Sequence, residues 1–176
     1  MPCVPAQLCL AKKVAQRLAP SYLLQCALRQ TETICMKCLR LILGDQLNIK
    51  HSWLSKNQRA NPDIIYVLME VRSETDYVVH HGQKVLGIFA AMRAFAQALK
   101  DAGLNVCYFR INDPANLQSF VFNLRYLVRT FGIGEIQRQQ ADEYRLEQLL
   151  LSLPEELNVP VTVVDSEHFL ADRQLL

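Results

Sequence analysis

Carboxylate, amide and phenol side chains follow the ends of two short apolar runs in this sequence. The first run, Leu39–Leu43, stops at Gly44, and the second, Ile64–Met69, stops at Glu70. Side chains of these types suit the recognition of ring N–H groups and sugar-like hydroxyls by hydrogen bonding rather than by reaction. The candidate ligand-binding residues at these two points are Gly44, Asp45, Gln46, Glu70, Glu74 and Tyr77.

A single acid after a strand has a simpler explanation, in which Asp45 caps the local backbone and Glu70 is solvated. Three acids that converge from two adjacent strands favour a binding site, because ligands of open α/β sheets bind outside the carboxyl ends of the strands. A small enzyme that uses these carboxylates as acid and base is an alternative, and it would need a carboxyl pKa raised toward neutrality.

Other common chemistries lack their signatures. The sequence has no phosphate-binding G-x-x-x-x-G-K-[ST] motif, and its Gly132-x-Gly134 follows a helical pattern rather than a first strand. No serine lies in a nucleophile elbow. The adjacent pair His80-His81 would point in different directions on a helix, so packing or hydrogen bonding at a helix start is the interpretation. We therefore predict no catalytic residue and no metal site.

The cysteines do not form a disulfide framework. Five of the 6 cysteines lie in the first 38 residues, including Cys35 and Cys38 in a C-x-x-C arrangement. A metal site would need a second pair of ligands at a suitable spacing, and none follows. We interpret the two thiols as chance or structural.

Apolar strand-length runs alternate with helical patterns along the chain. This alternation predicts an α/β fold, a Rossmann-like doubly wound parallel five-stranded sheet with helices on both faces. One helix is predicted from Gln83 to a stop at Gly103, and another from an N-cap at Asp113 to Gly132. A third carries Leu146 and Leu150. The expected strands are 39–43, 64–69, 105–110, 135–138 and 159–164.

Residues 1–35 differ from 36–176, which we expect to form the domain. The first segment is a poorly structured or weakly helical extension, which could arise from an upstream start codon because Met36 directly precedes the first strand; a targeting sequence is the alternative. The formal net charge is only +2, and no basic cluster predicts direct nucleic-acid binding. No apolar run has membrane-spanning length, so a cytoplasmic protein is expected.

An ordered series of motifs resembles one family. Its members are Leu-Ile-Leu-Gly-Asp-Gln-Leu at 41–47, Tyr77-Val-Val-His-His-Gly-Gln-Lys84, Ala91-Met-Arg-Ala-Phe-Ala96, Tyr108-Phe-Arg-Ile-Asn-Asp-Pro114 with Ser119-Phe120, Glu143-Tyr-Arg145 and His168-Phe-Leu170. From Met36 onward the chain is similar, in order and spacing, to the deoxyribodipyrimidine photolyase-related family. These are cryptochrome/photolyases that carry an iron–sulfur cluster and repair (6-4) photoproducts in DNA.

The resemblance implies an amino-terminal domain that binds an antenna chromophore, 6,7-dimethyl-8-ribityllumazine. By position, the antenna site would use Gly44, Asp45, Gln46, Glu70, Glu74 and Tyr77. In the full-length family a carboxy-terminal domain holds FAD, a [4Fe-4S] cluster and the DNA lesion, and acts as a lyase. That domain is expected to be absent here, so a separate flavin-carrying domain is the expected partner.

The resemblance is weaker around the fourth expected strand. The family has an apolar strand leading into Thr-Glu-Pro-Gly-Glu-Trp-Arg, whereas this chain has Ile136-Gln-Arg-Gln-Gln-Ala-Asp-Glu-Tyr-Arg145. Polar side chains in a central strand are destabilising unless they find partners. A truncated remnant, or a non-catalytic interaction module whose apolar face docks a partner, are the alternative interpretations of the chain.

Overall fold

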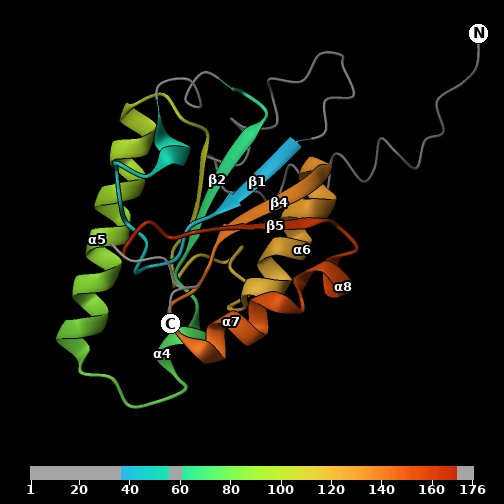
Figure 1. Cartoon of the computed structure of the whole chain (residues 1–176). Coiled ribbons are helices and arrows are strands. Elements are labelled where there is room, and N and C mark those ends of the chain that lie inside the picture. The colour runs from blue at the N-terminus through green and yellow to red at the C-terminus, as the bar shows by residue number, and fades with distance from the viewer. Residues whose placement is uncertain (1–36, 56–60, 170–176) are drawn as a thin grey trace, which may run out of the picture. The chain divides into compact units, whose positions relative to one another are not determined.

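The structure is a computed structural model that describes residues 37–55 and 61–169, so the predicted extension at 1–35 lies outside the described residues. Five parallel strands form one sheet in the order β3-β2-β1-β4-β5 (Figure 1). Their bounds are β1 (Lys37–Leu41), β2 (Ile64–Met69), β3 (Val106–Phe109), β4 (Ile133–Gln139) and β5 (Val161–Val164). The order reverses between β1 and β4, which confirms the doubly wound arrangement.

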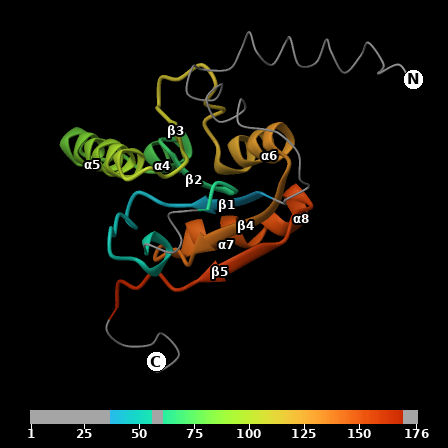
Figure 2. The same ribbon diagram turned by 90° about the horizontal axis from the view of Figure 1, so that it is seen from above.

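Helices lie on both faces of this sheet, as Figures 1 and 2 show. The long α5 covers one face, and α6, α7 and α8 lie on the other. The remaining helical segments are short and belong to connections. The bounds are η1 (Ser52–Leu54), α4 (Arg72–Thr75), α5 (Gly82–Asp101), α6 (Phe120–Phe131), α7 (Tyr144–Leu151) and α8 (Leu153–Leu157).

The core beneath α5 forms because alternate strand residues point to the same face of the sheet. Ile42, Tyr66 and Leu68 from the sheet side pack with Met92 and Leu99 of α5. The apolar stripe of α5 consists of Val85, Ile88, Phe89, Met92, Phe95, Ala96 and Leu99. Only its second half is fully buried, at Met92, Ala96 and Leu99. The first half of the stripe is therefore available for another role.

The helix predicted from Asp113 begins instead at Phe120, after the N-cap Ser119. The Asp113 side chain accepts a hydrogen bond from the backbone N–H of Ala115 at 2.9 Å, so it closes a turn rather than capping a helix. Gln118 has a φ of 60°, which a continuous right-handed helix does not permit. The predicted start was wrong because a polar side chain before a proline serves turns as well as helices.

The polar β4 is a full strand of seven residues. Its Arg138, only 1% exposed, donates to both carboxylate oxygens of Glu147 on α7, at 2.7 and 2.8 Å. Gln137 accepts a hydrogen bond from the Arg40 side chain at 2.9 Å. Arg138 and Gln137 thus have partners, which is the condition under which a central strand tolerates polar side chains, whereas the buried Gln139 Oε1 accepts no hydrogen bond from a described residue.

Candidate ligand site at the strand switch point

A cavity of about 310 Å³ lies at the carboxyl end of the sheet, next to the point where strand order reverses. We call it the switch-point cavity. Its walls come from the segments after β1 and β2, from the first half of α5, and from the start of α7. The lining residues are Leu43, Gly44, Asp45, Met69, Val71, Glu74, Thr75, Tyr77, His80, Lys84, Val85, Ile88, Phe89, Met92, Phe120, Glu143 and Leu146.

Most of this lining is apolar, with a few polar groups among it, which is the usual composition of a small-molecule site. The stripe residues Val85, Ile88, Phe89 and Met92 of α5 supply one wall. Gly44 supplies part of the opposite wall, and a Cβ there would lie 3.2 Å from both Ile88 and Met92. Glycine at this position therefore lets α5 approach the end of β1 closely.

The structure brings together Gly44, Asp45, Glu74 and Tyr77 in this lining. The other two predicted site residues, Gln46 and Glu70, are not among the lining residues. Both side chains are buried, at 1% and 0% exposed. The idea that Glu70 is a solvated acid is therefore wrong.

Glu70 is held by a dense set of donors. Its carboxylate accepts from Arg93 at 2.6 and 2.8 Å, from the Tyr108 hydroxyl at 2.6 Å, and from the backbone N–H of Ile111 at 2.8 Å. Burial alone would raise the pKa of Glu70, but these hydrogen bonds outweigh it and lower the pKa below its ordinary value of 4.5. The Glu70 backbone carbonyl accepts a hydrogen bond from the Asn116 side chain. Through these contacts, Glu70 joins the end of β2 to the segment that follows β3.

Gln46 closes the turn after β1. Its Oε1 accepts from the backbone N–H of Leu43 at 3.2 Å, and its Nε2 donates to the carbonyl of Gln140 at 3.1 Å. These bonds tie the β1 end to the β4 end across the switch point. Gln46 thus supports the loop that carries Asp45.

Glu74 differs from Glu70 in how its two carboxylate oxygens are used. Oε2 accepts from Nη2 of Arg145 at 2.9 Å. Oε1 is buried, and no described residue donates a hydrogen bond to it. A buried acceptor without a donor is destabilising, and such groups in native proteins call for an explanation.

Arg145, in the first turn of α7, connects several parts of the cavity rim. Besides Glu74 it donates to Glu143 at 2.8 Å, and its guanidinium carbon lies 4.0 Å from the centroid of the Tyr77 ring. Burial would lower the pKa of Arg145, but the hydrogen bonds to Glu74 and Glu143 outweigh it and raise the pKa. Tyr77 also contacts His80, and the centroids of the two rings are 5.1 Å apart in an edge-on arrangement.

Asp45 lies on the exposed side of the cavity. Its pKa is raised, first because neighbouring atoms exclude water from the carboxyl, and further because the carboxylates of Asp142 and Glu143 lie nearby. The nearby His168 opposes this rise. Negative charge is therefore concentrated at this edge, and a hydrogen-bond donor of a ligand would reduce the repulsion.

Sequence reasoning did not place Lys84, His80 and Glu143 in the site. Glu143 could have been found by the same rule that found Asp45, because it follows the carboxyl end of a strand next to β1. Lys84 and His80 could have been found from their place at the start of the helix after Tyr77. His81 is the N-cap of α5, and its Nδ1 accepts from the backbone N–H of Gln83 at 3.3 Å, as expected of a histidine at a helix start.

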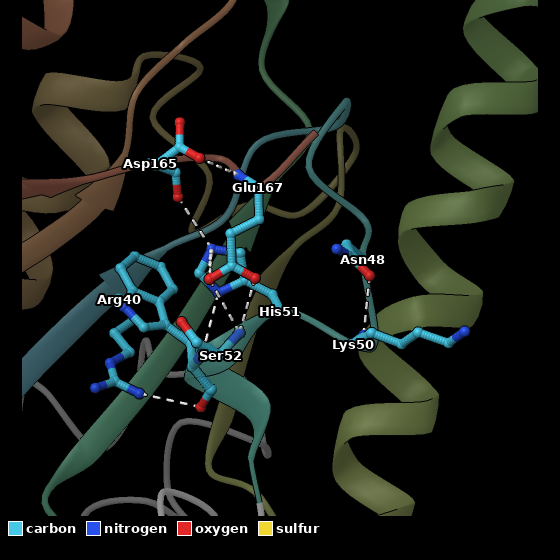
Figure 3. Close-up of polar contacts among 8 residues, drawn as sticks. Arg40, Asn48, Lys50, His51, Ser52, Asp165 and Glu167 are labelled. Carbon is cyan, nitrogen blue, oxygen red and sulfur yellow. Dashed lines mark hydrogen bonds and ion pairs between the residues drawn. The ribbon is translucent and has the colours of Figure 1, made fainter. Parts of the chain in front are cut away.

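A second polar cluster lies where the segment after β5 meets the loop after β1 (Figure 3). His51 is buried, its Nδ1 accepts from the backbone N–H of Trp53, and its Nε2 contacts the carbonyl of Asp165 at 3.1 Å. The Glu167 carboxylate accepts from the backbone N–H of Ser52 at 3.1 Å. These contacts hold two chain segments together, and none of these residues lines the switch-point cavity.

The described residues show no group of three or more His, Cys, Asp or Glu arranged to hold a metal ion. Cys38 carries a thiol whose pKa burial raises to about 11, so it is a poor nucleophile at neutral pH; Cys35 lies outside the described residues. Over the same described ranges, none of the helices has the length and apolar character needed to cross a membrane.

The structure is an α/β domain of the Rossmann-like, doubly wound type with a cavity at its strand switch point. Residues 40–176 match the family model described as deoxyribodipyrimidine photo-lyase-related protein, and the chain belongs to this family. A (6-4) photolyase from Agrobacterium fabrum (strain C58 / ATCC 33970) is 32% identical over 136 residues, which make up 77% of this chain and 26% of that protein. The chain therefore spans about a quarter of the length of this curated relative.

Among solved structures, a protein from the universal stress protein family of Burkholderia pseudomallei is similar in chain course. It shares 12% sequence identity, and the match covers 75% of this chain and 98% of that one with a TM-score of 0.40.

Proposed function

We propose that this chain binds an antenna chromophore of the ribityllumazine type, 6,7-dimethyl-8-ribityllumazine, in the switch-point cavity. When bound, this group would absorb light and pass the excitation to a flavin held by another part of a photolyase-related protein. The residues described here would make and break no bond. Their role is to bind the chromophore, orient it and exclude water from it.

The observation that carries the proposal is the place of Glu74 in the lining of a mostly apolar cavity, with a carboxylate that is paired to Arg145 through one of its two oxygens. A lumazine ring has the matching features, a flat apolar body with one imide N–H donor on its edge. That N–H would donate to the Glu74 carboxylate, and the ring would lie against the apolar α5 residues. A carboxylate that accepts from a neutral N–H forms a charge-assisted hydrogen bond, which is stronger than a neutral one.

The polar rim suits the ribityl chain. Its hydroxyls can both donate and accept, and Asp45 and Glu143 are acceptors while Lys84 is a donor. The volume of about 310 Å³ lies at the lower end of the range for small-molecule sites. The cavity thus favours one compact heterocycle over a dinucleotide.

Membership in the photolyase-related family, and similarity to a protein named (6-4) photolyase, support a role of the whole protein in DNA photorepair. In this proposal FAD and a [4Fe-4S] cluster belong to another part of that protein. Lyase activity would require that part.

The test is an absorption and fluorescence titration of the purified, folded chain with 6,7-dimethyl-8-ribityllumazine. We expect saturable binding with a shifted absorption band and altered fluorescence. Riboflavin, which carries the same ribityl chain on a larger ring system, serves as the size control and should bind more weakly. Absence of lumazine binding to a chain shown to be folded would overturn the proposal and favour a remnant or an interaction module.

A further inference from the structure

Resting on the proposed function, we propose that Arg145 is a positioning residue of the switch-point cavity. Its guanidinium would fix the Glu74 carboxylate and the Tyr77 ring together, so that two lining residues of the cavity keep one arrangement. Arg145 is not among the lining residues, so it would act through its two neighbours.

The two oxygens of the Glu74 carboxylate have different surroundings. Arg145 takes Oε2 at 2.9 Å and leaves Oε1 without a described donor. Without this contact, the carboxylate could rotate about its last torsion, which is broad for glutamate. Arg145 thereby fixes the orientation of the Glu74 carboxylate in the cavity wall.

Arg145 also contacts the ring of Tyr77. The distance of 4.0 Å from the guanidinium carbon to the ring centroid is within the range of a stacked cation–π contact. Arg145 therefore covers one face of Tyr77 while it binds Glu74. Because the two residues follow β2 in the same connection, one side chain from α7 orders both of them.

The side chain of Arg145 is itself held in place by a second carboxylate. Its Nε donates to Glu143 at 2.8 Å, so one edge of the guanidinium is held within α7 while Nη2 reaches Glu74. A lysine has no planar fork and cannot make both contacts in this geometry. Charge alone is therefore insufficient for the role.

The chain offers a matched control in Arg125. This arginine pairs with Glu156 at 2.7 Å and lies 5.8 Å from the Phe122 ring centroid, yet none of the three lines the cavity. Its side chain is 31% exposed, close to the 38% of Arg145. Arg125→Met thus removes a similar set of contacts away from the site.

The experiment compares lumazine dissociation constants for the full chain and for Arg145→Met, Arg145→Lys and Arg125→Met. We expect Arg145→Met to weaken binding about tenfold, the loss of one oriented contact of about 1.4 kcal/mol. Arg145→Lys should recover only part of this, and Arg125→Met should bind like the wild type. Thermal unfolding of each variant shows which of them are folded.

A double-mutant cycle with Glu74→Ala separates positioning from a general structural effect. If Arg145 acts through Glu74, the change Arg145→Met should have little further effect once Glu74 is alanine. Wild-type affinity in Arg145→Met, or effects that simply multiply in the double variant, would overturn the inference while leaving the proposed function standing. Failure of the wild-type chain to bind overturns both.

Discussion

Glu70 and Glu74 lie four residues apart after the same strand, yet their carboxylates have opposite surroundings. Glu70 is fully buried and accepts hydrogen bonds from Arg93, Tyr108 and Ile111. Glu74 lines the cavity with one oxygen paired to Arg145 and the other without a described partner. The first carboxylate has several described donors, whereas the second has a described donor at only one of its two oxygens.

This comparison teaches that an acid at a strand end is not by itself a site residue. The number of donors that the fold brings to it decides its role, and those donors come from distant parts of the sequence. Arg93 lies on α5 and Tyr108 on β3, whereas the side-chain donor to Glu74 among the described residues, Arg145, lies on α7. We therefore expect Glu70 to govern stability and Glu74 to govern binding.

The largest expected effect is on stability when Glu70 is removed. Glu70→Ala leaves the Tyr108 hydroxyl and the Ile111 N–H without their acceptor, and it should lower the free energy of unfolding by about 3 kcal/mol. Urea denaturation followed by circular dichroism measures this. Lumazine affinity of the folded fraction should stay within about threefold of wild type, a change below 1 kcal/mol. A stability equal to that of the wild type would contradict the structural role.

The same carboxylate predicts a dependence of stability on pH. Because the folded-state pKa of Glu70 is lowered from 4.5, its contribution is fully present above that value and is lost as the pH falls through the folded-state pKa. The difference in unfolding free energy between wild type and Glu70→Gln should therefore shrink as the pH is lowered from about 6 to about 3. A difference that is constant over this range would show that folding does not lower the pKa of Glu70.

Removing the Glu74 carboxylate should weaken lumazine binding and have little effect on stability, the reverse of the effects expected for Glu70. Glu74→Ala should weaken lumazine binding at least tenfold, about 1.4 kcal/mol, because the imide N–H loses a charged acceptor. Stability should change by less than about 1 kcal/mol, since the Arg145 pair is partly exposed and Arg145 keeps Glu143. Calorimetric titration and urea denaturation of the same preparation measure both.

Asp45→Ala should also weaken lumazine binding, but by a smaller factor than Glu74→Ala, because Asp45 is exposed.

The smallest effect is expected at Gly44. An alanine Cβ would press on Ile88 Cγ2 and Met92 Sδ at 3.2 Å; the methionine side chain can yield, whereas the β-branched Ile88 is stiff and requires a small shift of α5. Gly44→Ala should change stability by less than about 1 kcal/mol and narrow the cavity enough to weaken lumazine binding a few-fold. The matched control is Gly87→Ala on α5, where a Cβ has no neighbour within 4 Å. Equal lumazine affinity in the two variants would show that the ligand does not use this wall.

Much of the fold was predictable because the strands are short apolar runs and the helices have clear periodicity. Gly44, Asp45, Glu74 and Tyr77 could be brought to one edge by the rule for parallel strands alone. The start of α6 could not be predicted from the sequence. Asp113 closes a turn, and the loop before Phe120 depends on contacts such as the hydrogen bond from Asn116 to the Glu70 carbonyl. Local sequence does not contain such contacts.

The partners of buried polar groups were also beyond sequence reasoning. Arg138 was expected to disturb a central strand, and its bidentate pairing with Glu147 depends on how α7 packs against β4. Likewise, nothing in the spacing of Glu70 and Glu74 indicates which carboxylate faces the cavity. The distinction arises only when α5, β3 and α7 are placed in three dimensions.

The most direct test of the central claim is the affinity of the wild-type chain and of Glu74→Ala for 6,7-dimethyl-8-ribityllumazine and for its N3-methyl derivative, which lacks the imide N–H. If Oε1 of Glu74 accepts from that N–H, methylation should weaken binding to the wild type at least tenfold, about 1.4 kcal/mol, and should have little effect on the variant. If methylation weakens binding equally in both proteins, or in neither, Glu74 is not the acceptor and the account of the site is wrong.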